Sequence, residues 1–359
     1  MTLLTSSDQK YTAIWQAQKP LEEDWIKEIL GPFVNEYVVD ARHEIVLDNA
    51  ILLDAFTFLH DRGYYERFRG RNAFLVHFLD ETYAGGYDVY KNFRGVIRCF
   101  WSDAFDQRYV MKMALGYTRG RGRGDAFLLP ASQRKYVWSF VGQTRKATRP
   151  DAIHALAGLA PHFLSSSDSP AGRSATKAAG GGQQPLGPRE FSEVLSNTVF
   201  APSPMGNVNI ECFRTYEALE RGAVPIIEKR WGFDYYRSLL GDHPMPTVGS
   251  WIEARRLIQA MMNNGDEIDR VQRECVDWWS GYKRSYTNKI ADFLESRARA
   301  GSVNHPMVSK LSSMPGWRLF EIARHHNAPA MLRRVGVYAS RLFKEGQLLV
   351  GYRPGMKAD

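Results

Sequence analysis

The sequence predicts an α/β protein with two doubly wound, Rossmann-like domains that face each other across a cleft, followed by C-terminal helices. Short apolar runs alternate with helical patterns on both sides of residue 134, and such alternation is typical of parallel sheets. A chain of 359 residues is longer than the chains that usually fold around a single hydrophobic core, so two domains are expected. A composition that is 44% hydrophobic and 13% aromatic is that of a folded globular chain.

The first domain is predicted for residues 1–133. NAFLVHFLDE (72–81) reads as a buried strand that ends in acidic residues, and GVIRCFW (95–101) reads as the next strand. Because parallel strands end at one edge of a sheet, we expect the acidic residues after these runs to face the cleft.

The second domain is predicted for residues 134–300. Strands are expected in KYVWSFVGQTRK (135–146) and AVPIIE (223–228), and a helix begins RPDAIHALAGLAPHFL (149–164). EFSEVLSNTVFAPSP (190–204) reads as a helix followed by a strand, and residues 250–300 read as a long helical run. Pro150 and Asp151 stand where a helix N-terminus favours both residue types.

Two segments differ in composition from the rest. Residues 165–188 are dominated by Ser, Gly and Ala, and are predicted to form a mobile surface loop, either an inert insertion or a functional flap. Residues 301–359 form a basic helical tail with nine Lys/Arg against three Asp/Glu. Within it, 329–346 has the pattern of a basic amphipathic helix, which would lie on an anionic membrane or pack back onto the domains.

The bulk properties narrow the class of protein. The net charge of +8 suits nucleic acid, anionic lipid, a nucleotide or an acidic polysaccharide, and does not choose among them. The three cysteines show no metal-ligand spacing and fit a reduced compartment. No apolar run approaches the roughly 18 to 20 residues that span a bilayer, and the first residues lack a secretory pattern. We therefore expect a cytoplasmic protein, with peripheral contact at the inner membrane face through its tail.

The stretch SPMGNVNIECFRTYEALERGAVPII (203–227) reads as a turn, a helix and a buried strand. Gly206 and Asn207 allow a ligand to approach the backbone, and the following helix N-terminus favours a negative group. Arg214 and Glu217 share one helix face, where a guanidinium can grip phosphate and a carboxylate can accept ribose hydroxyls. The same two residues could equally form an ordinary surface pair one turn apart.

This stretch resembles the donor-site segment of exostosin-like glycosyltransferases, especially the branch with the ribitol xylosyltransferases and their bacterial relatives. The matching residues are Ser203, Pro204, Gly206, Asn207, Glu211, Arg214, Glu217, Ala218, Gly222, Pro225, Ile226 and Ile227. The resemblance implies the GT-B type of fold, with a nucleotide-sugar held mainly by the second domain.

Weaker similarities extend the resemblance over residues 70–300. WSFVGQTRKATR is similar to the strand that opens the family's second domain, which implies roles near the diphosphate for Phe140, Gly142, Arg145 and Arg149. LVHFLDE with YKNFRGVIRCFWSD, and the aromatic CVDWWSGYK, resemble further family segments. The expected donor-binding residues are thus Gly142, Arg145, Arg149, Ser203, Gly206, Asn207, Glu211, Arg214 and Glu217.

Sugar transfer needs a base for the acceptor hydroxyl and positive groups for the departing diphosphate. No Asp-x-Asp pair occurs in the chain, so we expect a metal-independent site in which Arg214, Arg145 and Arg149 neutralise the leaving group. The expected base is Glu81 or Asp80, with Asp103 in reserve. By the period of two along a strand, His77 would share a face with Glu81.

The expected function is transfer of a sugar, with UDP-sugar favoured, to a glycan or lipid-linked glycan, in surface polysaccharide or glycoconjugate synthesis such as that of lipopolysaccharide. Inversion at the anomeric carbon is expected by family analogy.

Two alternative functions stay open. One is a nucleic-acid-binding protein, suggested by YTRGRGRGD (117–125) and nine tryptophans, although no nucleic-acid-binding motif is present. The other is an inactive glycan-binding domain.

Overall fold

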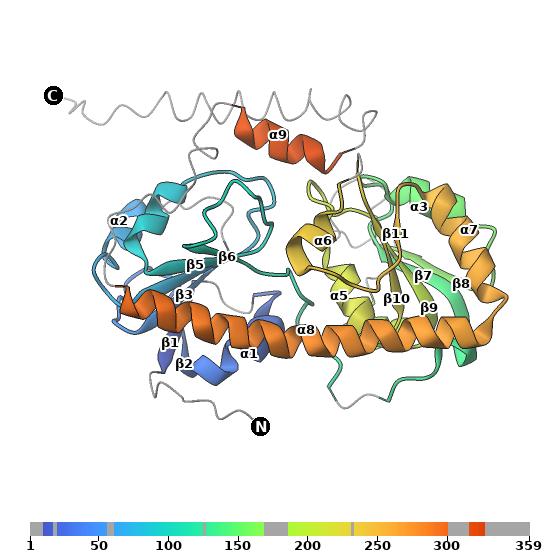
Figure 1. Ribbon diagram of the computed structural model, residues 1–359, viewed down its shortest axis with the longest axis horizontal. Helices are drawn as coiled ribbons and strands as arrows, with labels where there is room; N and C mark the ends of the chain where they lie inside the picture. Colours follow the sequence, from blue (N-terminus) through green and yellow to red (C-terminus); the bar gives the residue numbers. More distant parts are fainter. Residues whose placement is uncertain are drawn as a thin grey trace.

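The computed structural model describes residues 10–16, 20–55, 61–124, 127–168, 186–230, 233–300 and 316–326. Within them the chain forms two parallel sheets side by side, joined beneath by one long helix (Figure 1). Most of the predicted loop 165–188 and all of the predicted helix 329–346 lie outside the described residues. At the edges of the predicted loop, Ser165 and Ser166 end a strand and Pro188 begins a helix.

The first sheet has the order β2-β1-β3-β4-β5-β6, and each neighbouring pair is parallel. Its strands are β1 (Tyr11–Trp15), β2 (Val34–Val39), β3 (Ala50–Asp54), β4 (Ala73–His77), β5 (Gly95–Arg98) and β6 (Val110–Lys112), with helices α1 (Glu23–Leu30) and α2 (Arg62–Glu66). β3, β4 and β5 are buried throughout, as expected of strands covered on both faces.

The second sheet has the order β11-β10-β9-β7-β8, also parallel. Its elements are β7 (Tyr136–Gly142), α3 (Arg149–Leu156), β8 (His162–Ser166), α4 (Pro188–Ser196), β9 (Thr198–Ser203), α5 (Phe213–Glu220), β10 (Val224–Glu228), α6 (Tyr235–Leu240), β11 (Thr247–Val248) and α7 (Trp251–Met262). The chain moves outward in one direction from β7 to β8 and in the other from β9 to β11. The point between β7 and β9 is therefore the topological switch of this sheet, where open α/β sheets bind ligands.

The predicted class of two Rossmann-like, doubly wound domains with C-terminal helices is confirmed by these sheet orders. Two local expectations are corrected. β4 ends at His77 and Leu79 has a φ of 70°, so the period-two relation between His77 and Glu81 does not apply. The helical run 250–300 is two helices, because Asn264 caps a new helix with its side chain.

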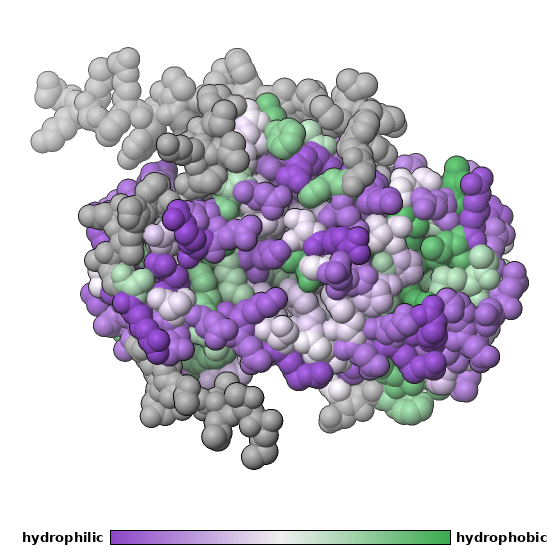
Figure 2. Space-filling view, in the orientation of Figure 1, coloured by the Kyte–Doolittle hydropathy of each residue, from purple (hydrophilic) through white to green (hydrophobic). Residues whose placement is uncertain are grey.

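The second of these helices, α8 (Gly265–Arg299), runs along both domains (Figure 1). Its first half packs against the second domain, while Tyr286 donates to the carbonyl of Lys112 at 2.9 Å and Arg297 to that of Arg94 at 3.1 Å. The helix that was assigned to the second domain therefore also covers the first. Figure 2 shows that the face crossed by α8 is largely polar, with apolar residues in small separate groups.

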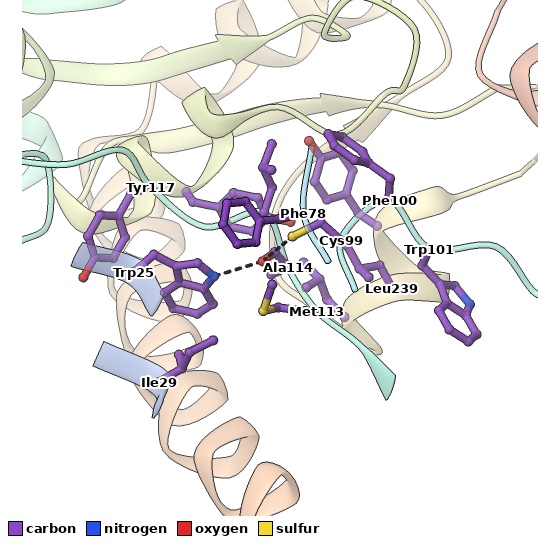
Figure 3. Close-up of a cluster of buried hydrophobic side chains, with 14 of the residues drawn as sticks. Trp25, Ile29, Phe78, Cys99, Phe100, Trp101, Met113, Ala114, Tyr117 and Leu239 are labelled. Atoms are coloured by element: carbon purple, nitrogen blue, oxygen red, sulfur yellow. Dashed lines mark hydrogen bonds between the residues drawn. The ribbon is translucent and has the colours of Figure 1, made fainter. Parts of the chain in front are cut away.

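A buried cluster joins the two domains beside α1 (Figure 3). Trp25 donates its indole N–H to the carbonyl of Ala114 at 3.0 Å, and Cys99 contacts the same oxygen. Leu239 of α6 brings the second domain into this cluster.

All three cysteines are buried, and none of them forms a disulfide bond. No helix among the described residues is long and apolar enough to cross a membrane.

Glu22, directly before α1, is completely buried, and neither carboxylate oxygen has a hydrogen-bond partner. Burial raises the pKa of this carboxyl to about 7. The folded state thus keeps a proton that the unfolded chain releases near pH 4.5, so stability is lost as the pH rises from there through 7.

We expect Glu22→Gln to reduce the loss of unfolding free energy between pH 5 and pH 8 by about 2 kcal/mol. The side chain caps no backbone group, so the substitution breaks no hydrogen bond. Urea unfolding at the two pH values measures the effect, and Glu36→Gln, which removes an exposed carboxylate on β2, is the control. An unchanged pH dependence in Glu22→Gln would contradict the expectation.

Candidate functional site

A pocket of about 280 Å³ lies where β7 and β8 end, beside the switch point of the second sheet. Its walls come from the end of β7, the start of α3, the end of β8, α4 and the start of α5. Two further wall residues come from residues 117–124, called here the linker because they run from the first domain to the second. The lining residues are Thr118, Arg121, Val141, Gly142, Gln143, Arg149, Ser165, Ser167, Leu186, Phe191, Cys212, Phe213, Arg214 and Glu217.

The start of α5 forms one wall of this pocket. Its N-cap, Cys212, has extended backbone angles and no side chain caps the helix. Cys212 and Phe213 both line the pocket, so the uncapped end of the helix faces it. An uncapped N-terminus attracts negative charge through its free N–H groups and the helix dipole.

Arg214 stands in the first turn of α5 and crosses the end of β7. Its guanidinium lies 4.2 Å from the centre of the Phe140 ring, and Nη2 is 3.5 Å from the carbonyl of Val141. The buried Nε has no hydrogen-bond partner. Gly142 has a φ of 138°, and a Cβ at that position would lie 3.2 Å from Arg214 Nη2. The glycine therefore leaves the guanidinium room to face the pocket.

Arg149, the first residue of α3, brings a second guanidinium to the same place. Its Nη1 donates to the carbonyl of Gln143 at 3.0 Å, while its buried Nε has no partner. Burial, and then the charge of Arg214, lower the pKa of Arg149 to about 10. Two guanidiniums this close in a largely buried site favour an anion, because its charge would relieve their repulsion and its oxygens would accept guanidinium N–H groups.

Glu217 is the one carboxylate in the pocket lining, against three guanidiniums. Its Oε1 accepts from Thr118 Oγ1 at 2.6 Å and from Arg121 Nη1 at 2.9 Å. The sequence connected the arginine–glycine run 117–125 with the nucleic-acid alternative and gave neither linker residue a role in donor binding. The alternating arginines were the signal, but only the folded linker shows which of them reaches the pocket.

Glu81 lies between the two domains and outside this pocket. Its Oε1 accepts the backbone N–H groups of Asn207, Val208 and Asn209 at 2.8, 2.6 and 3.0 Å. A Cβ on Gly206 would lie 2.9 Å from the same oxygen, so the glycine permits this approach. The predicted base and the predicted donor loop are thus in direct contact, and the facing edges of the domains touch here.

Asp80, the other expected base, is enclosed within the first domain, in surroundings that favour a structural role. It is 1% exposed and forms an ion pair with Arg98, whose Nη2 lies 3.3 Å from Oδ2. Tyr87 and the backbone N–H of Ala84 also donate to the carboxylate. Burial raises the pKa of Asp80, and Arg98 opposes that effect. A substrate hydroxyl cannot reach an enclosed carboxylate of this kind.

The remaining predicted donor residues fall outside the pocket lining. Glu211 is buried between the domains, where it accepts from Leu115 N at 2.7 Å and from two tyrosine hydroxyls, and burial raises its pKa to about 7. Ser203 is buried at the end of β9, and Arg145 is exposed. The structure therefore gathers four of the nine expected donor residues: Gly142, Arg149, Arg214 and Glu217.

Other expected groups lie elsewhere. Asp103, the reserve base, is exposed and accepts from the indole of Trp101 at 3.0 Å. His77 contacts the hydroxyl of Tyr90 at 2.7 Å inside the first domain. Helix α9 (Trp317–Arg324) lies over the contact between the domains, where Arg318 donates to the carbonyl of Thr82 and the following His325 contacts Asn209. No group of three metal-ligating side chains occurs in the part of the chain that is described.

Fold and pocket together define a two-domain parallel α/β protein with an arginine-lined pocket beside the switch point of its second domain. Residues 127–298, just under half of the chain, match the family described as the RXYLT1 C-terminal domain. The match covers the whole second sheet, and it supports the resemblance to the branch that includes the ribitol xylosyltransferases.

Solved structures with similar overall shape include an α1,3-fucosyltransferase, at 11% identity and a TM-score of 0.49, covering 86% of this chain and 95% of that one. T4 phage BGT in complex with UDP and Mn²⁺ has 12% identity and a TM-score of 0.46, covering 80% of this chain and 99% of that one. T4 phage BGT with UDP-glucose gives the same values. No curated protein sequence matches the chain.

Proposed function

We propose that this chain is a glycosyltransferase that moves a sugar from a nucleotide-sugar to a glycan or lipid-linked glycan acceptor. One observation supports the proposal above all. Arg149 and Arg214 converge on one pocket with their Nε groups unpartnered, at the uncapped N-terminus of α5. A diphosphate has the charge and the oxygen acceptors that this arrangement lacks. The match of residues 127–298 supports the same class.

In the proposed reaction the acceptor oxygen attacks the anomeric carbon, and the bond from that carbon to the diphosphate breaks. The electron pair leaves with the diphosphate, whose growing negative charge the two guanidiniums and the helix dipole stabilise. These cations are part of the chain, and we therefore propose that transfer does not depend on a metal. Inversion at the anomeric carbon is proposed by analogy with the resembling family.

Of the two expected bases, Glu81 is the one we propose. Its Oε1 is occupied by three backbone N–H groups, whereas Oε2 receives only the side-chain amide of Asn207, at 3.4 Å. Oε2 is therefore the atom that could take the proton from an acceptor hydroxyl. Glu81 also faces the second domain, on the side from which the donor loop approaches.

The rest of the donor is proposed to lie between Gly142 and Glu217. Glu217 would accept the ribose hydroxyls, and the volume of about 280 Å³ suits a diphosphate with part of its sugar or nucleoside. We favour a uridine nucleotide as donor and propose synthesis of surface polysaccharide or glycoconjugate as the role. Peripheral contact with anionic membrane at the cytoplasmic face, through the basic tail, belongs to the same proposal.

The test is a thermal-shift panel of UDP, CDP, GDP and ADP, with and without EDTA, followed by turnover of the corresponding sugar nucleotides. We expect one diphosphate to raise Tm, by an amount that grows with the logarithm of its concentration, and the shift to survive EDTA. Absence of any shift would overturn the proposed function. A shift that EDTA abolishes would overturn the proposal that the reaction is independent of metal. An affinity for oligonucleotides that falls steeply as the salt concentration rises would favour the nucleic-acid alternative.

A further inference from the structure

The linker contributes two side chains that meet on one oxygen of the pocket. Thr118 Oγ1 and Arg121 Nη1 donate to Glu217 Oε1 at 2.6 and 2.9 Å. The other oxygen, Oε2, has no hydrogen-bond partner in the part of the chain that the structure describes. Glu217 therefore has one oxygen fixed by the protein and one left to a ligand.

The surroundings of Glu217 restrict it further. Its side chain is 3% exposed, so it cannot swing into solvent. Arg121 is itself held, because its guanidinium lies 3.8 Å from the centre of the Phe191 ring on α4. A carboxylate oxygen with its lone pairs open, fixed in a pocket, matches a ligand with adjacent hydroxyl groups. Its two lone pairs can accept both hydroxyl groups of a vicinal diol.

The linker that carries both donors is anchored to both domains. On the first domain, its Arg119 N–H donates to the carbonyl of Leu21 and its Gly120 N–H to Asp24 Oδ2, both at 2.7 Å. On the second, Arg221 Nη2 donates to the carbonyl of Gly122 at 2.7 Å. The position of Thr118 and Arg121, and with it the orientation of Glu217, therefore depends on how the two domains are held.

We propose that Thr118 and Arg121 are positioning residues that orient Glu217 toward the 2′,3′-diol of the donor's ribose. Through the linker, the position of the first domain relative to the second influences how the second domain recognises ribose. This inference rests on the proposed function. It deepens that proposal by assigning to the linker the discrimination between ribonucleotides and deoxyribonucleotides.

Isothermal titration of the full chain tests the proposal with two probes: the nucleoside diphosphate that gives the largest thermal shift in the panel above, and its 2′-deoxy form. We expect the wild type to bind the ribonucleotide about tenfold more tightly, because a hydrogen bond to a charged group contributes at this level. Arg121→Gln should weaken ribonucleotide binding by about tenfold and bring the ratio of the two affinities near one. Arg121→Lys should keep part of the preference, since it can still donate to Oε1.

Two variants keep the test decisive. Thr118→Val changes only the donor hydroxyl and should shift the ratio in the same direction if Arg121→Gln does not fold. Arg119→Gln, in the same linker, removes a surface pair with Glu23 and should leave the ratio unchanged. A wild type that binds no diphosphate overturns the proposed function and this inference together. A wild type that binds both probes equally, or folded Thr118 and Arg121 variants that keep the wild-type ratio, overturns the inference alone.

Discussion

Arg214→Gln is expected to lower sugar transfer by about 10²- to 10³-fold, the loss typical when one preorganised charged donor to a developing anion is removed. The guanidinium faces the pocket at the start of α5, where its Nε has no hydrogen-bond partner among the described residues. Its loss leaves Arg149 as the remaining arginine that we propose to contact the diphosphate. Diphosphate affinity should fall with turnover, because the charge is present before as well as during transfer.

The fold should survive this substitution. The hydrogen bonds of Arg214 to Val141 O and Cys212 Sγ are long, at 3.5 and 3.9 Å, and it repels Arg149, so its packing on the Phe140 ring is the main contact that the substitution changes. Arg214→Lys should fall between wild type and Arg214→Gln, because a point charge cannot replace the fork of the guanidinium. Arg145→Gln is the matched control, a basic residue of the neighbouring loop that is exposed and outside the pocket lining.

Initial rates and diphosphate titrations of these variants check the expectation. If Arg214→Gln retains wild-type transfer, the diphosphate does not bind at the start of α5. If Arg145→Gln is as damaging as Arg214→Gln, the donor extends beyond the pocket described here.

Asp80→Asn is expected to destabilise the protein by about 3 to 5 kcal/mol, the cost of leaving a buried charge without its partner. Arg98 is completely buried, with its Nε on the carbonyl of Cys99 and its Nη1 on the hydroxyl of Tyr90. Its guanidinium also lies 4.2 Å from the centre of the Phe105 ring. Once the Asp80 charge is gone, none of these neutral contacts offsets the buried positive charge.

The prediction separates a structural Asp80 from a catalytic one. Denaturant unfolding should show the loss in Asp80→Asn, and the double variant Asp80→Asn with Arg98→Met should recover part of it, because the unpaired cation is removed. Glu81→Gln is the neighbouring control, and it should be far less destabilising because its carboxylate is only half-buried. Wild-type stability with lost transfer in Asp80→Asn would restore the catalytic role expected from the sequence.

Much of the second domain was predictable from local signals. The turn 203–207, the helix after it and the strand 224–228 follow one another closely, so glycines, prolines and apolar runs mark each boundary. Arg214 and Glu217 stand three apart and share a helix face, and the family resemblance then selects them as donor residues rather than an ordinary surface pair. Gly142 was identified at a strand end, and its positive φ agrees with a backbone that passes close to a side chain.

The two expected site residues that the structure places away from solvent, Asp80 and Glu211, share one physical feature, the burial of charge. Asp80 and Glu211 look like cleft residues in the sequence because carboxylates are usually exposed. Donors from near and distant parts of the chain enclose each of them: Tyr87 and Arg98 surround Asp80, and two tyrosines with Leu115 surround Glu211. Helix and strand periods do not reveal such partners, because the contacts form only when the loops and elements of the fold pack together.

The sequence by itself determined the two-sheet class, the switch-point motif and the guanidinium that faces the pocket, since strand periods, glycine turns and helix faces depend on near neighbours. The tertiary structure alone decided which carboxylates are sealed in, that the linker supplies Thr118 and Arg121, and that Glu81 bridges the domains. These outcomes depend on the relative placement of segments that can stand 126 residues apart in the chain, as Glu81 and Asn207 do. Packing and desolvation over the whole fold set that placement, and local propensity does not.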